Sequence, residues 1–250
     1  MSDHLKLRIK FQKTGAIRYI GHLDVMRFFQ KCLRRAEIDV CYTTGFSPHQ
    51  ILTFAAPLSV GLESYGEYMD VEVHSATNSA DIVQRLNDAS VPEIKIVSAK
   101  LLPEWAENAM ASVAAARYFV TFVEDRIPNI FKADDDSIRE ALLAFLSKDS
   151  IPYVKESKKG TREVDLRPGI FELSWNNEEK GLEMLLDASS GENIKPSQVL
   201  NAFLGQWNES LIDNSLCITR LDVYTRNSPS EEGQAGDLLS MDDVGKEFSF

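Results

Sequence analysis

The chain has 250 residues, of which 44% are hydrophobic and 26% charged, and its formal net charge is -11 at pH 7. This length and composition fit one large globular domain or two of ordinary size. No apolar run approaches the roughly 20 residues that span a bilayer, and the first residues, MSDHLKLRIKF, lack the pattern of a signal peptide. We therefore expect a soluble cytoplasmic protein with no membrane partner.

The cysteines and the distribution of charge further limit which classes of protein fit this sequence. Cys32, Cys41 and Cys217 are odd in number and widely spaced, so they predict neither a disulfide framework nor a metal knuckle. Residues 1–50 carry nine bases and four acids, a local charge of +5, which leaves -16 for the remainder. A local basic surface binds nucleic acid even on an acidic chain, because charges are screened within roughly 8–10 Å at ordinary salt.

The first half alternates between extended and helical patterns. Leu5, Leu7, Ile9 and Phe11 alternate with polar residues, as in a half-buried strand. The further elements predicted in this half are a helix at 22–36, a strand at 66–74, a helix at 79–89 and a strand at 93–102.

The second half repeats that order. Its predicted elements are a strand at 117–125, a helix at 134–149, extended stretches at 151–176 and 181–189, a helix at 195–207 and a strand at 216–226. Acids in the first turn of one helix and Pro196 near the start of the other support these boundaries. The shared βαββαβ order predicts an α+β fold of tandem ferredoxin-like units, each with an antiparallel sheet and helices on one face.

This repeat predicts the domain organisation. We expect units at 1–102 and 117–226, joined by a linker at 103–116. Residues 227–250 contain six acids and one base, which is typical of a mostly disordered tail. The stretch DLLSM, at 237–241, is the part of this tail expected to make a short contact.

The helix at 22–36 carries a stripe of cations. Its members, at helical spacings of four, seven and eight, are Arg27, Lys31, Arg34 and Arg35. One interpretation is the solvated face of an amphipathic helix, with cations in the last turn suiting the helix dipole. The other is an anion-binding surface for phosphate or an acidic protein, to which Arg18 would contribute.

A long loop follows this helix, YTTGFSPHQILTFAAPLSVGLESYGEY at 42–68. Long loops in compact units are usually functional or disordered, and the many apolar residues here argue against disorder. Tyr42, Phe46 and His49 beside a basic stripe suit stacking on the bases of single-stranded RNA. The alternative is that Phe46 and Phe54 cap the core.

A second basic stretch, SKKGTRE, reads as a hairpin tip with Gly160 in the turn. Lys158 and Arg162 in this stretch, and Arg167 shortly after it, are candidates for a second phosphate contact. The alternative is a tip that only adds solubility.

Three stretches of the chain resemble one bacterial family. They are KTGAIRYIGHLDVMRFFQKCLRRAEIDVCYTTGFSPHQ, FAAPLSVGLESYGEYMDVEV and KESKKGTREVDLRPGI. Over most of residues 5–225 the chain is similar to the radical-SAM-linked proteins, a family of unknown function. Its members stand alone or follow a cobalamin-type radical SAM enzyme in one chain, often encoded near a ribonuclease of the E/G type and ribosomal proteins. The resemblance implies an accessory role near a radical SAM enzyme and RNA or ribosome metabolism.

Catalytic motifs are sparse. The cysteine spacing excludes an iron–sulfur cluster held by closely spaced thiolates, and the sequence has no P-loop, dinucleotide fingerprint or nucleophile elbow. Six histidine and carboxylate residues lie within about 50 positions of one another, but their spacing matches no metal-ligand signature. The members of this grouping are His22, Asp24, His49, Glu63, Glu67 and Asp70. Of these, His22 and His49 are candidates for acid–base cleavage of RNA.

The sequence therefore favours a non-enzymatic, radical-SAM-associated accessory protein that binds RNA or a ribosome-related partner through its N-terminal basic face. It predicts no cofactor, no metal and no DNA partner. Two alternatives stay open: a metal-independent, endoribonuclease-like RNA-processing enzyme, and an adaptor that only binds a radical SAM enzyme.

Overall fold

The computed structural model describes residues 4–157, 160–226 and 236–250. It contains two compact units: unit 1 comprises Met1–Ala114 and Arg220–Phe250, and unit 2 comprises Ala115–Thr219. The chain is α+β, and the strands of each unit pair antiparallel. Among the described residues, no helix combines the length and apolar character needed to cross a membrane.

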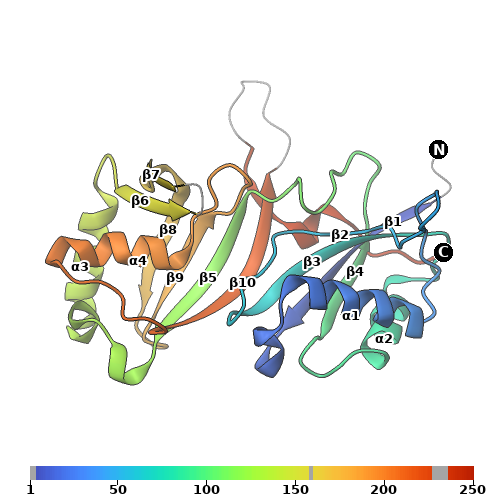
Figure 1. Ribbon diagram of the computed structural model, residues 1–250, viewed down its shortest axis with the longest axis horizontal. Helices are drawn as coiled ribbons and strands as arrows, with labels where there is room; N and C mark the ends of the chain where they lie inside the picture. Colours follow the sequence, from blue (N-terminus) through green and yellow to red (C-terminus); the bar gives the residue numbers. More distant parts are fainter. Residues whose placement is uncertain (1–3, 158–159, 227–235) are drawn as a thin grey trace. The chain divides into compact units, whose positions relative to one another are not determined.

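Unit 1 is built on an antiparallel sheet with strand order β4-β1-β3-β2. Strand β3 also neighbours β10 (Leu216–Arg226), which belongs to unit 1 from Arg220 onward. The elements, drawn in blue to green in Figure 1, are β1 (Leu5–Lys13), α1 (His22–Arg35), β2 (Leu52–Phe54), β3 (Glu63–Val73), α2 (Ser79–Asp88) and β4 (Ile96–Leu101). Strand β2 lies in the stretch predicted as a long loop. The other elements follow the predicted order and lie within a few residues of the predicted positions.

The core of unit 1 lies between the sheet and the two helices. Alternate residues of β1, from Leu7 to Phe11, are fully buried on the same side as Phe29 of α1 and Leu86 of α2. This burial follows from the period of two in strands and 3.6 in helices, which gives each element one apolar side. Both helices therefore cover one face of the sheet.

The opposite face of this sheet is covered by irregular chain. The carbonyl oxygens of Ala106 and Glu107 accept hydrogen bonds from Lys6 and Arg8 of β1. Ala109 is fully buried as well. The stretch expected to be a linker is thus part of the body of unit 1 as far as residue 114.

The C-terminal residues also belong to unit 1. Strand β11 (Leu238–Ser240) pairs with β10, the 3-10 helix η6 (Met241–Val244) follows, and Met241 is completely buried. The expectation of a disordered tail is wrong for residues 236–250, because these residues pack on unit 1 and form ion pairs with it. Asp242, for example, pairs with Lys100 at 3.1 Å. The contact expected at 237–241 is confirmed. The remaining tail residues, 227–235, lie outside the described ranges.

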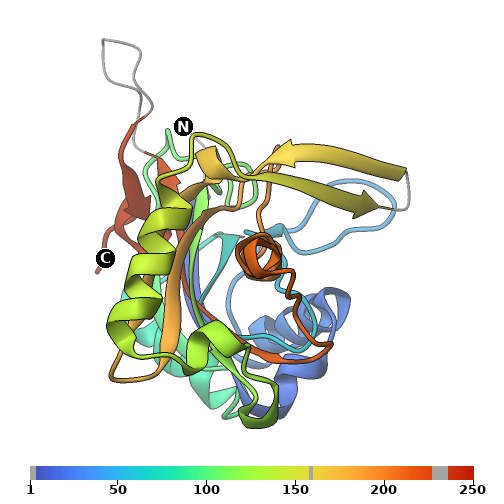
Figure 2. The same ribbon diagram turned by 90° about the vertical axis from the view of Figure 1, so that its left-hand side faces the viewer.

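Unit 2 contains an antiparallel sheet with described order β5-β9-β8 and a separate two-stranded hairpin, β6-β7, which Figure 2 shows in yellow. The predicted extended stretch at 151–176 is divided by a 3-10 turn, η4 (Arg167–Gly169). The elements are β5 (Ala115–Phe122), α3 (Asp135–Leu146), β6 (Pro152–Ser157), β7 (Gly160–Asp165), β8 (Ile170–Asn176), β9 (Gly181–Asp187) and α4 (Pro196–Leu204).

Aromatic rings form the centre of unit 2. Phe145 of α3 meets Phe203 of α4 at 5.3 Å between ring centroids, and Phe131 stacks on Trp175 of β8 at 5.8 Å. Helix α3 begins where predicted, because Asp134 accepts a hydrogen bond from the backbone of Ser137. The tandem ferredoxin-like arrangement stays a prediction.

Candidate functional site

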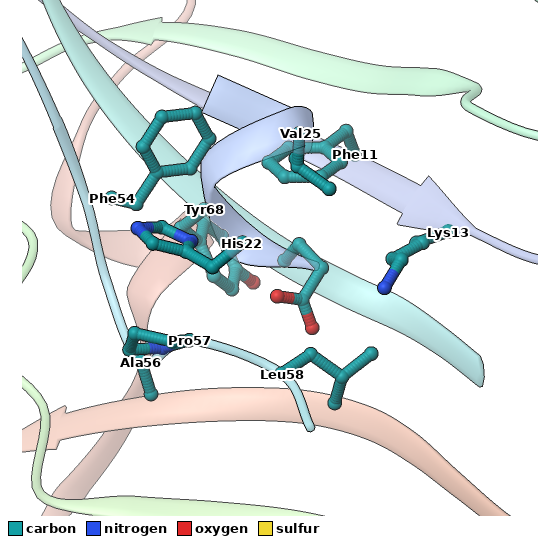
Figure 3. A pocket seen from close by; sticks show the side chains of 10 residues that line it. Phe11, Lys13, His22, Val25, Phe54, Ala56, Pro57, Leu58 and Tyr68 are labelled. Carbon is teal, nitrogen blue, oxygen red and sulfur yellow. The ribbon is translucent and has the colours of Figure 1, made fainter. Parts of the chain in front are cut away.

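A small polar cavity lies where β1, the start of α1, β3 and the chain after β2 meet in unit 1 (Figure 3). His22 lies beside Phe54, and Lys13 lies across the cavity from both. The volume is about 20 Å³, which accommodates about one water molecule. The lining residues are Phe11, Lys13, His22, Val25, Phe54, Ala56, Pro57, Leu58, Glu67 and Tyr68.

Lys13 places a buried amine at this cavity. It continues the inward row of Leu7, Ile9 and Phe11, and its side chain is only 2% exposed. Its Nζ donates a hydrogen bond to the carbonyl oxygen of Ile20 at 3.0 Å. Burial holds the pKa of Lys13 below its ordinary value, and the nearby positive charge of Arg220 adds to the effect, while Glu67 opposes it.

A buried ion pair joins β3 to β10 beside Lys13. Arg220 donates to Glu67 from Nε at 2.8 Å and from Nη2 at 2.6 Å, and Nη2 also donates to the carbonyl oxygen of Ala56 at 2.7 Å. Both side chains are buried. The pair is thus neutral and anchors the chain after β2 to the sheet.

His22 is the first residue of α1, and its ring packs edge-on against Phe54 at 5.3 Å between centroids. The structure brings His22 together with Glu67 and Lys13, which are groups suited to proton transfer. The space between them is far below the roughly 300 Å³ of ordinary ligand pockets. A nucleotide does not fit there.

The other carboxylates of the predicted grouping are separated from one another. Asp24 pairs with Arg27 at 3.4 Å, and Glu63 accepts from Arg18 and from the backbone of Gly15. Asp70 pairs with Arg8 on the opposite face of the sheet. Each carboxylate therefore has its own donor, and the grouping does not form one cluster.

A larger cavity, about 900 Å³, lies on that opposite face of unit 1. Arg8 lines it while its Nε and Nη2 donate to Asp70 at 2.8 and 3.0 Å. The Nη1 group of Arg8 has no hydrogen-bond partner in the described part of the chain, although the residue is 1% exposed. Trp105 lines the same cavity and is exposed. The unused donor is available to a water molecule or to an acceptor that enters.

The predicted basic stripe lies on the exposed side of α1. Arg27, Lys31 and Arg34 are all exposed, and neither Lys31 nor Arg34 has an ion-pair partner among the described residues. Arg35 differs, because its Nη2 donates to the carbonyl oxygen of Ala89 at 2.6 Å. Arg18 also has partners: it hydrogen-bonds both Glu63 and Tyr19.

The loop after α1 carries an exposed aromatic residue, Phe46, at its tip. A β-bridge pairs Tyr42 with Gln50, and the backbone of Thr43 donates to His49 at 2.9 Å. Gly45 has a positive φ of 122°, which a residue with a side chain rarely adopts. Phe46 follows it at 112% of its reference exposure, so it does not cap the core, whereas Phe54 is buried. Tyr42 and His49 are exposed as well.

The predicted hairpin cations of unit 2 have different surroundings. Lys158 lies outside the described residues. Arg162 is exposed and pairs with Glu192 at 3.6 Å. Arg167 donates to the carbonyl oxygens of Leu146 and Ile170, so it holds the turn before β8 and is less suited to a phosphate contact.

The sequence reasoning missed the buried charges of unit 1. The alternation from Leu5 to Phe11 places Arg8 on the polar side of a half-buried strand, and nothing in the sequence marks Arg220, although each lies against an acid within the protein. The available signal was Gly66, where a Cβ atom would come within 2.6 Å of the backbone of Asp222. A glycine inside a strand pattern indicates close approach of another backbone, which buries the flanking residues.

The profile of one protein family, DUF2344, described as an uncharacterized protein conserved in bacteria, matches residues 6–196. No curated protein matches the chain.

Proposed function

We propose that this chain, which belongs to the DUF2344 family of uncharacterized proteins conserved in bacteria, binds single-stranded RNA through unit 1. Phe46 stacks on a base, and the exposed cations of α1 contact phosphates. The observation that carries the proposal is the complete exposure of Phe46 on a hydrogen-bonded loop that follows the basic helix.

The loop tip supports a binding role because it holds an aromatic ring in solvent without a structural need. Its backbone is fixed by the Tyr42–Gln50 bridge and the Thr43–His49 hydrogen bond. A loop whose backbone is already fixed loses little entropy when a partner covers it. Stacking on a base contributes about 1–3 kcal/mol for any base, so such a tip favours RNA without reading its sequence.

The helix supports phosphate contacts through three of its four predicted cations. Arg27, Lys31 and Arg34 lie at i, i+4 and i+7 and share one exposed side of α1. Arg35 is assigned instead to the carbonyl oxygen of Ala89. Phosphate contacts add affinity that falls with salt and position a strand without specifying its sequence.

The wider role rests on the resemblance to radical-SAM-linked proteins. Within this proposal the chain is an accessory protein that brings RNA or a ribosome-related partner to a radical SAM enzyme. The strand order β4-β1-β3-β2 of unit 1 supports a ferredoxin-like unit as the scaffold, a fold type with the βαββαβ order.

Fluorescence anisotropy with a labelled single-stranded RNA, measured from low to physiological salt, tests the proposal. Arg27→Gln, Lys31→Gln and Arg34→Gln, made together, should weaken binding to oligo-U and oligo-A alike and flatten the salt dependence. The matched control removes the same charge from unit 2 through Lys132→Gln, Arg139→Gln and Lys148→Gln. This control should bind as the parent does.

The outcomes separate the alternatives. Equal loss in both triple variants would mean that only net charge matters, and the proposed interface would be wrong. If the parent binds no RNA but retains a protein partner through α1, the adaptor function replaces this one. Cleavage of the RNA that disappears with His22→Ala or His49→Ala would instead establish the nuclease alternative.

A further inference from the structure

Three side chains capable of binding a metal ion meet in unit 1 at the start of β1 and the end of β3. His4 precedes β1, Cys41 lies between α1 and β2, and His74 follows β3. One ligand atom of each residue lies within 4.8 Å of the others. The two imidazole rings are 4.7 Å apart between centroids, at an interplanar angle of 77°.

Backbone pairing fixes this meeting point. Leu5 of β1 and Val40 each pair with Val73 of β3, so the chain segments carrying His4 and Cys41 flank β3 at the same level. The backbone of Cys41 donates to the carbonyl oxygen of Glu72, and that of His74 donates to the carbonyl oxygen of Asp39, both at 2.8 Å. The three residues therefore converge through main-chain hydrogen bonds.

We propose that His4, Cys41 and His74 bind a zinc ion. A thiolate with two imidazoles is a ligand set suited to Zn²⁺, whereas Mg²⁺ and Ca²⁺ prefer oxygen ligands. Three protein ligands leave the fourth tetrahedral position to water. The bond lengths of a zinc site imply ligand separations of roughly 3.3–3.6 Å for two imidazoles and one thiolate. Binding would therefore bring together ligand atoms that now lie within 4.8 Å of one another, a shift of about 1 Å in exposed imidazoles.

The site has a structural consequence that goes beyond RNA binding. Cys41 is buried and directly precedes Tyr42, at the base of the loop that carries Phe46. Zinc would tie this base to the start of β1 and the end of β3. The sequence could not predict the site, because its ligands come from three segments far apart in the chain.

Metal titration of tag-free, chelator-treated and reduced protein tests the proposal. Co²⁺ should produce the thiolate-to-cobalt charge-transfer band and the visible d–d bands of a tetrahedral site. Competition against a chromophoric chelator should give one Zn²⁺ per chain, and zinc should raise the melting temperature. Cys41→Ser and His74→Gln should each weaken zinc binding by at least about 100-fold, above the 10–100-fold typical of outer-shell changes.

Cys217→Ser and His22→Gln are the matched controls, because they remove a thiol and an imidazole outside the cluster, and both should bind zinc as the parent does. His74 is exposed, so His74→Gln keeps the test decisive even if Cys41→Ser fails to fold. The proposal is overturned if the parent takes up no stoichiometric zinc, if the thiolate band is absent, or if His74→Gln binds zinc as tightly as the parent.

Discussion

Arg220 and Glu67 lie 153 positions apart in the sequence, yet they form a buried pair with donor–acceptor distances of 2.5–2.8 Å. Arg220 comes from the last long strand and Glu67 from the middle of β3. The pair therefore joins the two chain segments that make up unit 1. A carboxylate buried at this position is tolerated only because the guanidinium neutralises it.

Glu67→Gln should destabilise the protein strongly, because it leaves Arg220 buried beside a neutral amide. Breaking a buried pair by removing one partner typically costs about 3–5 kcal/mol. Urea unfolding at pH 7 measures the change. The control is Asp136→Asn, which breaks the exposed pair with Arg139 and should cost less than about 1 kcal/mol. Similar losses in both variants would contradict the role assigned to burial.

Lys13 should make stability rise with pH. Its pKa is lowered in the folded state, so between the folded pKa and the unfolded value of about 10.5 the unfolded chain binds more protons, and the free energy of unfolding increases with pH over that window. Lys13→Met removes this contribution. The free energy of unfolding of Lys13→Met minus that of the parent should be most positive at pH 7 and fall towards pH 10 in urea unfolding. The exposed control Lys31→Met should show no such trend, and a constant difference for Lys13→Met would refute the prediction.

Phe46→Ala should reduce RNA affinity by about 1–3 kcal/mol and leave the melting temperature unchanged, because the ring makes no core contact. Anisotropy and thermal unfolding on the same sample measure the two effects. Phe54→Ala is the contrasting variant: its buried ring should cost about 3–5 kcal/mol of stability. A fall in melting temperature for Phe46→Ala would show that the tip packs on the protein in solution.

Met241→Ala should lower the free energy of unfolding by about 2–5 kcal/mol, because it opens a cavity under the C-terminal segment. The control is Met110→Ala, which truncates an exposed methionine and should change stability by less than about 0.5 kcal/mol. Denaturant unfolding distinguishes the two. If Met241→Ala unfolds as the parent does, residues 236–250 do not contribute to the core of unit 1.

The element order was predictable because it depends on local periodicity. The alternation from Leu5 to Phe11 and the acids at the start of α3 are visible within a few residues of sequence, and the structure places strands and helices accordingly. The covering role of 103–114 and 236–250 was not visible, since the acidic composition of the tail resembles disorder. What orders it is its pairing with β10 and with Lys100, residues distant in sequence.

For the candidate sites, helical spacing and loop composition are local properties, so they indicate without any structure which cations share one side of α1 and which aromatic residue follows them. Three further features depend on folding: Phe46 is exposed while Phe54 is buried, Arg35 donates to a backbone carbonyl, and His4, Cys41 and His74 converge. Burial and long-range contacts depend on which strands become neighbours. That choice is made by the packing of the whole unit and cannot be read from the spacing of residues along the chain.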